Sequence, residues 1–220
     1  MVVLRKLSGV FALIILLIGC ASSAKSQADC AYGYRIYLRD GSGKSITNAK
    51  VEVFGLSKRD KLPDAFRNAF INRVYFVGFV MYGCSYPGHF LLRVSADGFQ
   101  SYEQPITFTE GLVACELRLG PKGSGTKAEF ERLATLHGKV VDQRGLPVDG
   151  VQVEATNTNR RVYQARSSDS GYYELDLPKG VNTIRFTGTD IAPIVFENYR
   201  IEGKDPNLDV SVCRKCKPSE

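Results

Sequence analysis

The sequence predicts an all-β protein built of two antiparallel β-sandwiches in tandem. Short runs of alternating apolar and polar residues recur along its 220 residues, separated by Gly, Pro, Asn and Asp. This alternation is typical of strands that turn one face to a core and the other to water. No long stretch has helical periodicity, and one turn pattern occurs in each half of the chain, which indicates two similar units.

Residues 1–19 have the pattern of an export signal. Arg5 and Lys6 form a basic start, and the unbroken apolar run 10–18 follows. This run is too short to span a bilayer, which needs about 20 apolar residues, but it fits the core of a signal peptide. We therefore expect the protein to lie outside the cytoplasm, in the periplasm or at the cell surface.

The end of this segment, Leu17-Ile18-Gly19-Cys20, resembles the bacterial lipobox, in which cleavage precedes a cysteine that carries a diacylglycerol thioether. The resemblance implies an acylated Cys20, a flexible tether over residues 20–29 and a membrane as partner through the lipid. The alternative is ordinary cleavage after Ala24 or Ala28, which would release a secreted protein.

The strand patterns fall into two groups. A Gly/Pro/Ser-rich stretch at 120–127 separates them, so we expect a linker over 121–133 between a first sandwich at 30–120 and a second at 134–212. Residues 213–220 remain as a basic tail. Segments 63–72 and 128–134 are compatible with short helices. The patterns lie at 34–39, 51–53, 92–94 and 115–119 in the first group, and at 140–141, 151–154, 173–177, 184–186 and 208–212 in the second.

The repeated turn has the same order of residues in both units. An Asp ends a strand, a Gly turns the chain, and an aliphatic residue follows before the next strand: Asp40, Gly43 and Ile46 in the first unit, and Asp142, Gly145 and Val148 in the second. Glycine suits the tight bend, and we expect the aliphatic residue to fill the core.

The second unit resembles the carboxypeptidase regulatory-like domain. It carries the family's D-x-x-G-x-P-[IV]-x-G-[VA]-x-V pattern at 142–153, an S-D-x-G-x-Y segment at 168–173 and the L-P-x-G loop at 177–180. The resemblance implies a seven-stranded, transthyretin-like (Ig-like) sandwich. The first unit looks like a divergent copy that lacks the L-P-x-G loop and carries an insertion at 57–85.

No motif marks an active site, so we expect no catalytic residue, no bound metal and no cofactor. Gly41 to Ser45 reads G-S-G-K-S, but a phosphate-binding loop needs a glycine where this chain has Leu38, and then a helix. His89 and His137 lie in different units, without a zinc-protease or nucleophile-elbow motif. Carboxypeptidases that contain such domains bind zinc in a separate catalytic domain.

The cysteines are disulfide candidates, because the exterior of the cell is oxidising. Three of them belong to the first unit, and the sequence does not choose the pair among them. The tail pair forms a C-x-x-C motif outside the helical context that redox enzymes use, so a tail disulfide is favoured over a pairing to the domain, redox chemistry or a shared metal. The candidates are Cys30, Cys84, Cys115, Cys213 and Cys216.

The region 57–85 is rich in aromatic residues, which either fill the first core or contact a sugar or protein. Tyr75, Tyr82 and Tyr86 are the candidate contact residues. We interpret the protein as a non-catalytic binding or structural module of the cell envelope, with a protein or glycan partner. The alternatives are a carbohydrate-binding protein that uses these aromatics and, less favoured, a thiol-redox or hydrolytic enzyme.

The charge argues against a nucleic-acid partner. The full chain carries a formal +6, and without Arg5 and Lys6 it keeps 27 basic residues against 23 acidic ones, a net +4. This excess is small and dispersed along the chain, whereas nucleic-acid binding needs a concentrated basic surface.

Overall fold

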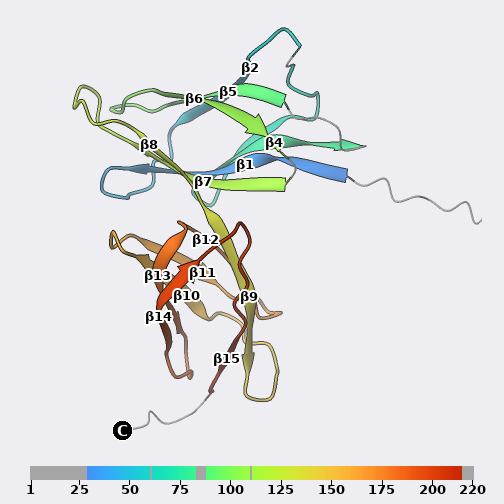
Figure 1. Ribbon diagram of the computed structural model, residues 1–220, viewed down its shortest axis with the longest axis vertical. Coiled ribbons are helices and arrows are strands. Elements are labelled where there is room, and N and C mark those ends of the chain that lie inside the picture. Colours follow the sequence, from blue (N-terminus) through green and yellow to red (C-terminus); the bar gives the residue numbers. More distant parts are fainter. Residues whose placement is uncertain (1–28, 60, 83–87, 110, 215–220) are drawn as a thin grey trace, which may run out of the picture.

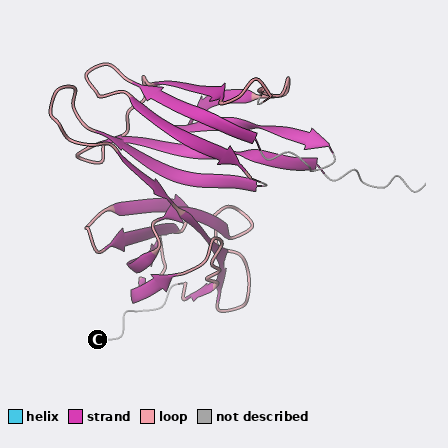
Figure 2. Ribbon diagram, turned by 45° about the horizontal axis from the view of Figure 1, so that its top comes forward, coloured by secondary structure: helices cyan, strands magenta, loops and turns pink. Residues whose placement is uncertain are grey.

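The computed structural model describes residues 29–59, 61–82, 88–109 and 111–214, and confirms the all-β class. The strands form two domains, which lie one above the other in Figure 1. Figure 2 shows the same two groups of strands in a tilted view. The described residues form no helix, so none of them provides a helix that could cross a membrane.

The first domain packs a five-stranded sheet, in the order β3-β4-β1-β7-β8, against a three-stranded sheet, β2-β5-β6. Aromatic and aliphatic side chains from both sheets form one core, in which the rings of Phe90 and Phe108 are buried 4.9 Å apart. The strands are β1 (Asp29–Asp40), β2 (Lys50–Gly55), β3 (Arg67–Ile71), β4 (Val74–Tyr82), β5 (Gly88–Ser95), β6 (Tyr102–Phe108), β7 (Gly111–Leu119) and β8 (Glu129–Arg132).

The second domain packs a four-stranded sheet, β11-β10-β13-β14, against a three-stranded one, β12-β9-β15. Its core contains Tyr173 and Phe186, whose rings meet edge to face at 5.5 Å. The strands are β9 (Ala134–Asp142), β10 (Gln152–Asn157), β11 (Val162–Arg166), β12 (Tyr172–Leu177), β13 (Gly180–Thr187), β14 (Ile194–Ile201) and β15 (Val210–Val212).

The two domains share most of their strand pairing. The first strand of each, β1 or β9, lies between an antiparallel partner (β4 or β12) and a parallel one (β7 or β15). In the other sheet, β5 lies between β2 and β6 as β13 lies between β10 and β14. Two strands differ: β3 pairs with β4 whereas β11 pairs with β10, and β8, which pairs with β7, has no counterpart in the second domain.

The repeated turn has the same hydrogen bonds in both domains. Asp40 Oδ1 accepts bonds from the backbone amides of Ser42 and Lys44, and Asp142 Oδ1 accepts from those of Arg144 and Leu146, all at 2.9 Å. The turn glycines have positive φ, 90° at Gly43 and 78° at Gly145, and Ile46 and Val148 are buried as expected.

Three sequence-based expectations in the first domain and linker are corrected. Residues 63–72 contain strand β3, and 128–134 contain β8, so neither segment is a helix. Region 57–85 is more than an insertion, because it supplies β4, the direct neighbour of β1. In both segments, antiparallel pairing with a strand adjacent in the sequence, β4 for β3 and β7 for β8, outweighs local periodicity.

The expected linker contains a strand at its C-terminal end. Its residues 129–132 form β8, which extends the first domain's sheet beside β7, and only Leu133 separates β8 from β9 of the second domain. Leu133 is buried, and its amide donates to the carbonyl of Ala114 at 2.9 Å. The chain thus passes from one domain to the other in extended, hydrogen-bonded conformation (Figure 1).

Candidate functional site

A buried ion cluster joins the two domains. Asp176 of β12 accepts hydrogen bonds from Arg35 Nη2 at 2.9 Å and from the Tyr37 hydroxyl at 2.7 Å, both of them on β1. Thr135, opposite Asp176 in β9, donates to the same carboxylate at 2.7 Å, and Glu174 also pairs with Arg35. The Asp176 side chain is only 3% exposed.

The position of Asp176 follows from strand geometry. In β12 the side chains of Tyr173, Leu175 and Leu177 face the core, so Glu174 and Asp176 face outward. The outward face of β1, which carries Arg35, covers Asp176. A buried carboxylate needs charged and hydrogen-bonding partners, and here the other domain supplies most of them.

The cluster fixes the protonation of two of its members. Burial, together with the neighbouring Asp176 carboxylate, raises the pKa of Tyr37, which therefore stays a neutral hydrogen-bond donor. Burial alone would lower the pKa of Arg35, but the carboxylates of Asp176 and Glu174 outweigh it and raise the pKa. At the junction, a charged Arg35 and a protonated Tyr37 hydroxyl therefore both donate hydrogen bonds to the Asp176 carboxylate.

A second charged group lies beside the first. Glu116 of β7, 2% exposed, lies 2.6 Å from Arg118 Nε and 3.1 Å from Arg39 Nε. The turn between β10 and β11 brings Arg161 from the second domain, 3.9 Å from Glu116 and 3.0 Å from Glu129 of β8. The two domains therefore meet over two separate ionic contacts.

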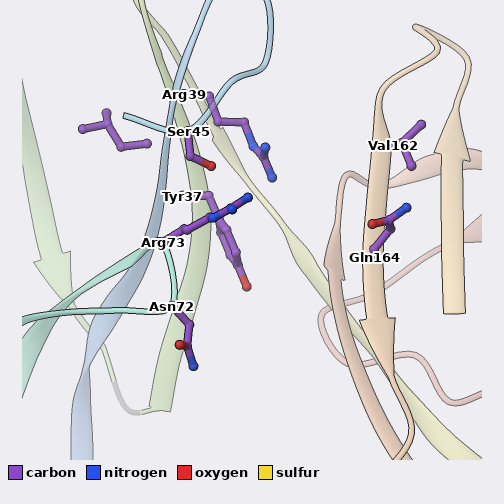
Figure 3. A pocket seen from close by; sticks show the side chains of 8 residues that line it. Tyr37, Arg39, Ser45, Asn72, Arg73, Val162 and Gln164 are labelled. Atoms are coloured by element: carbon purple, nitrogen blue, oxygen red, sulfur yellow. The ribbon is translucent and has the colours of Figure 1, made fainter. Parts of the chain in front are cut away.

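Two cavities open between the domains next to these contacts. One, of about 250 Å³, is lined by polar groups of the first domain, including Arg39 and Arg73, and by Val162 and Gln164 of β11. Figure 3 shows Arg39 and Arg73 extending from the first domain toward β11. The other cavity, of about 330 Å³, lies between the Gly41–Gly43 turn and the 159–162 turn and shares Arg39 and Val162 with the first.

The outward face of the five-stranded sheet also carries an apolar groove of about 360 Å³. Gly78 of β4, which lies opposite Gly33 of β1, lines part of it. Close contact requires glycine at both positions, since a Cβ on Gly78 would lie 2.2 Å from the Tyr32 carbonyl oxygen. Val80 and Leu112 on its sides are about half exposed.

The aromatic contact candidates separate in the structure. Tyr75 is 4% exposed and belongs to the first core, where its hydroxyl accepts a bond from the Ala49 amide at 2.9 Å. Its candidate contact role is therefore corrected to core packing. Tyr82, at the end of β4, is 73% exposed. Tyr86 lies outside the described residues.

The cysteines also separate. Cys115 is a buried free thiol in β7, which corrects its place among the disulfide candidates, and burial raises its pKa. Cys30 is buried in β1, and Cys213 follows β15. Cys20, Cys84 and Cys216 lie outside the described residues, so lipidation and the disulfide pairings stay predictions.

The residues singled out for enzyme motifs are structural where they are described. Gly41 to Ser45 form the first repeated turn and lead toward β2 instead of a helix. His89 Nδ1 lies 3.1 Å from the Thr107 hydroxyl on the neighbouring strand. Among the residues that the structure describes, no group of three or more His, Cys, Asp or Glu is placed to hold a metal.

The fold and the junction define a two-domain all-β protein whose domains meet over buried charges. Residues 135–212, which make up most of the second domain, match the model of the carboxypeptidase regulatory-like domain, as their motifs predicted. A search of curated proteins gives no match.

The chain is also similar to several solved structures of other proteins. The Bacillus anthracis TIE protein shares 14% identity at a TM-score of 0.31, over 84% of this chain and 34% of that one. A streptococcal ancillary pilin shares 10% identity at a TM-score of 0.30, over 86% of this chain and 63% of that one. BcpA, the major pilin subunit of Bacillus cereus, shares 8% identity at a TM-score of 0.32, over 76% of this chain and 55% of that one. The chain thus spans between a third and two thirds of these proteins, and we draw no functional conclusion from the likeness.

Proposed function

We propose that this chain is a non-catalytic module of the cell envelope that works by contact and presents two β-sandwiches in a fixed mutual orientation. The junction is the observation that carries this proposal. The two domains are joined by an extended crossing with one residue between β8 and β9, and by a carboxylate, Asp176, buried under the other domain. A rigid pair of sandwiches can transmit force or hold two surfaces in register, as a binding or structural protein requires.

The N-terminal sequence supports the location. The apolar run 10–18 and the lipobox-like Leu17-Ile18-Gly19-Cys20 favour export and acylation at Cys20. Acylation would hold the protein on a membrane, because each buried CH₂ contributes about 0.8 kcal/mol. The tether 20–29 would then connect the lipid to β1.

The family match of the second domain supports a role without catalysis, since regulatory-like domains accompany catalytic domains without supplying their active site. We propose further that the first domain is a divergent copy of the second. The shared pairing of β1, β4 and β7 with that of β9, β12 and β15, and the identical Asp turns, support this common origin.

Mass spectrometry of the mature protein, isolated from the membrane fraction of bacteria that express it, tests the proposal. We expect an N-terminus at Cys20 with a diacylglycerol thioether, and we expect Cys20→Ser to move the protein out of that fraction. Ser22→Ala, two residues away, is the control and leaves the fractionation unchanged. A mature N-terminus at Lys25 or Asp29 would overturn the lipid anchor but not export, and an uncleaved chain in the cytoplasm would overturn the envelope function.

A further inference from the structure

The two cavities at the domain junction are lined by arginines. Five arginines and one glutamate contribute to the two linings, a net formal charge of +4. Glu129 and Glu131, which pair with Arg161 from the rim, reduce the local excess to +2. The lining arginines are Arg39, Arg73, Arg118, Arg160 and Arg161.

Several of these guanidinium groups keep donors that the described residues do not use. Arg118 is 11% exposed, and its Nε bonds to Glu116, but neither of its terminal nitrogens has an acceptor among the described residues. Arg73 and Arg160 form no ion pair with any described carboxylate, and both have positive φ, 68° and 58°. A guanidinium carries five N–H donors, so this cleft offers an array of unused donors and positive charge.

The arginines of the larger cavity indicate which charged group a ligand would carry. Guanidinium forks match the oxygens of a carboxylate, sulfate or phosphate two at a time. Neighbouring arginines repel one another, and an oxyanion between them relieves this repulsion. The larger cavity, of about 330 Å³, reaches the range of 300–1,000 Å³ that small-molecule sites occupy.

The smaller cavity indicates the chemistry of the rest of the ligand. This smaller cavity, of about 250 Å³, shares Arg39 and Val162 with the larger one, and besides Arg39 and Arg73 it is lined by neutral hydrogen-bonding groups, among them Ser45, Asn72 and Gln164. Amide and hydroxyl groups pair well with the hydroxyls of a sugar ring. Tyr37 is the one aromatic residue in either lining, and its hydroxyl is bound to Asp176, so the cleft lacks the stacking platform that single-stranded nucleic acid uses.

Building on the contact function proposed above, we propose that the cleft between the domains binds an acidic sugar, a unit of a glycan that carries a carboxylate or sulfate. The oxyanion lies between Arg118, Arg160 and Arg39, and the sugar hydroxyls face Asn72 and Gln164. The site exists only while the two domains keep their orientation, because each supplies part of the lining.

Isothermal titration of the purified protein with defined saccharides tests the proposal. The probes are the glucuronate–N-acetylglucosamine disaccharide, a sulfated heparin disaccharide and, as the neutral match, N,N′-diacetylchitobiose. We expect at least one acidic disaccharide to bind, weakening as salt rises from 50 to 500 mM because exposed charges are screened. Both acidic probes carry a carboxylate, so stronger binding of the heparin disaccharide would show that sulfate adds to the contact. Equal binding of chitobiose, or binding of neither acidic probe, would overturn the proposal.

Arg73→Ala and Arg160→Ala are the test variants, since both side chains are exposed and outside the ion pairs that hold the junction. We expect Arg160→Ala to weaken binding about tenfold, as for the loss of one charge-assisted contact, and Arg73→Ala to weaken it less. Arg185→Ala removes the same charge from β13, lines neither cavity and is the control. An equal effect of Arg185→Ala, or tighter binding of a short oligonucleotide or polyglutamate peptide than of the sugars, would contradict the assignment.

The outcome of the saccharide titration is independent of the outcome of the test of the proposed function. The N-terminal mass and the fractionation of the Cys20→Ser variant do not depend on the cleft. A correctly acylated protein that binds no acidic sugar would remove the ligand and leave the envelope module. A cytoplasmic protein that binds the sugar would do the reverse.

Discussion

Arg35 of β1 and Asp176 of β12 meet across the domain boundary, with Arg35 Nη2 2.9 Å from Asp176 Oδ1. The pair combines charges from two domains at a position where the Asp176 carboxylate has little access to water. Breaking a buried pair by removing one partner leaves the other charge unpaired, which destabilises more than the pair itself stabilises.

We therefore expect Asp176→Ala to lower the free energy of unfolding by about 3 kcal/mol, since it strips the Tyr37 hydroxyl of its acceptor and leaves Arg35 with only the more exposed Glu174 as a carboxylate partner. Glu174→Ala, two residues away on the same strand and 39% exposed, should cost less than about 1 kcal/mol. Urea unfolding followed by circular dichroism measures both. Equal losses in the two variants would show that the junction does not depend on the buried carboxylate.

Acid should destabilise the protein through its repeated turns. The Ser42 hydrogen bonds lower the pKa of Asp40, and the amides of Leu146 and Arg144 lower that of Asp142. Because both folded pKa values lie below the unfolded value of about 3.9, the stabilisation is present above pH 4 and is lost as pH falls through the folded pKa.

Melting temperatures between pH 6 and pH 2 test this expectation. Asp142→Asn should melt lower than the parent at pH 6, and the difference should shrink toward pH 2, where the parent's Asp142 is protonated. Asp169→Asn changes an exposed aspartate without a hydrogen bond among the described residues and should follow the parent at every pH. A constant gap between parent and Asp142→Asn over the whole range would contradict the assignment.

Glycine at position 78 should be indispensable for the first sheet. A Cβ there would lie 2.2 Å from the Tyr32 carbonyl oxygen and 2.8 Å from the Gly33 Cα, so the two central strands would have to separate. We expect Gly78→Ala to destabilise the protein by at least about 2 kcal/mol, as overpacking does. Gly41→Ala meets no atom within 4 Å and is the control in the same urea experiment. A Gly78→Ala protein as stable as the control would refute the close approach of β1 and β4.

Cys115 should be the unreactive thiol of the first domain. It is buried, and burial raises its pKa, so reagents that react with thiolates should label it only after denaturation.

We also predict a Cys30–Cys84 disulfide. Asp29 pairs with Tyr82, and the two residues from Tyr82 to Cys84 span at most ~7 Å of chain. Peptide mapping without reduction, before and after alkylation, measures both. Labelling or disulfide linkage of Cys115 in the folded protein would contradict the first prediction, and a Cys30 peptide linked to a cysteine other than Cys84 would contradict the second.

Structure that depends on residues close together in the sequence could be predicted. The Asp turns at 40–46 and 142–148 were predictable because their hydrogen bonds join residues within four positions of one another. The alternation at 173–177 predicted β12 and its core residues for a similar reason, since side-chain direction follows directly from strand geometry.

Contacts between strands and between domains could not be predicted from the sequence. The spacing of Phe66 and Phe70 is compatible with a short helix, but residues 67–71 pair with β4, the next strand along the chain, which brings Tyr75 against Phe70 with ring centroids 4.6 Å apart. The alternation at 173–177 places Asp176 on the face turned away from the core, and nothing within its own strand indicates that the first domain covers that face. The arginines of the cleft were missed for the same reason: each stands at an ordinary polar position, and only the meeting of two domains gathers them.

Residual dipolar couplings of backbone amides in both domains test most directly whether the two sandwiches form one rigid unit. Through the extended β8–β9 crossing and the Arg35–Asp176 contact, a single alignment tensor should fit the couplings of residues 30–133 and of 134–214 together. Separate tensors of clearly different magnitude for the two domains would mean that they reorient independently, and would contradict the fixed junction on which the proposed function and the cleft both depend.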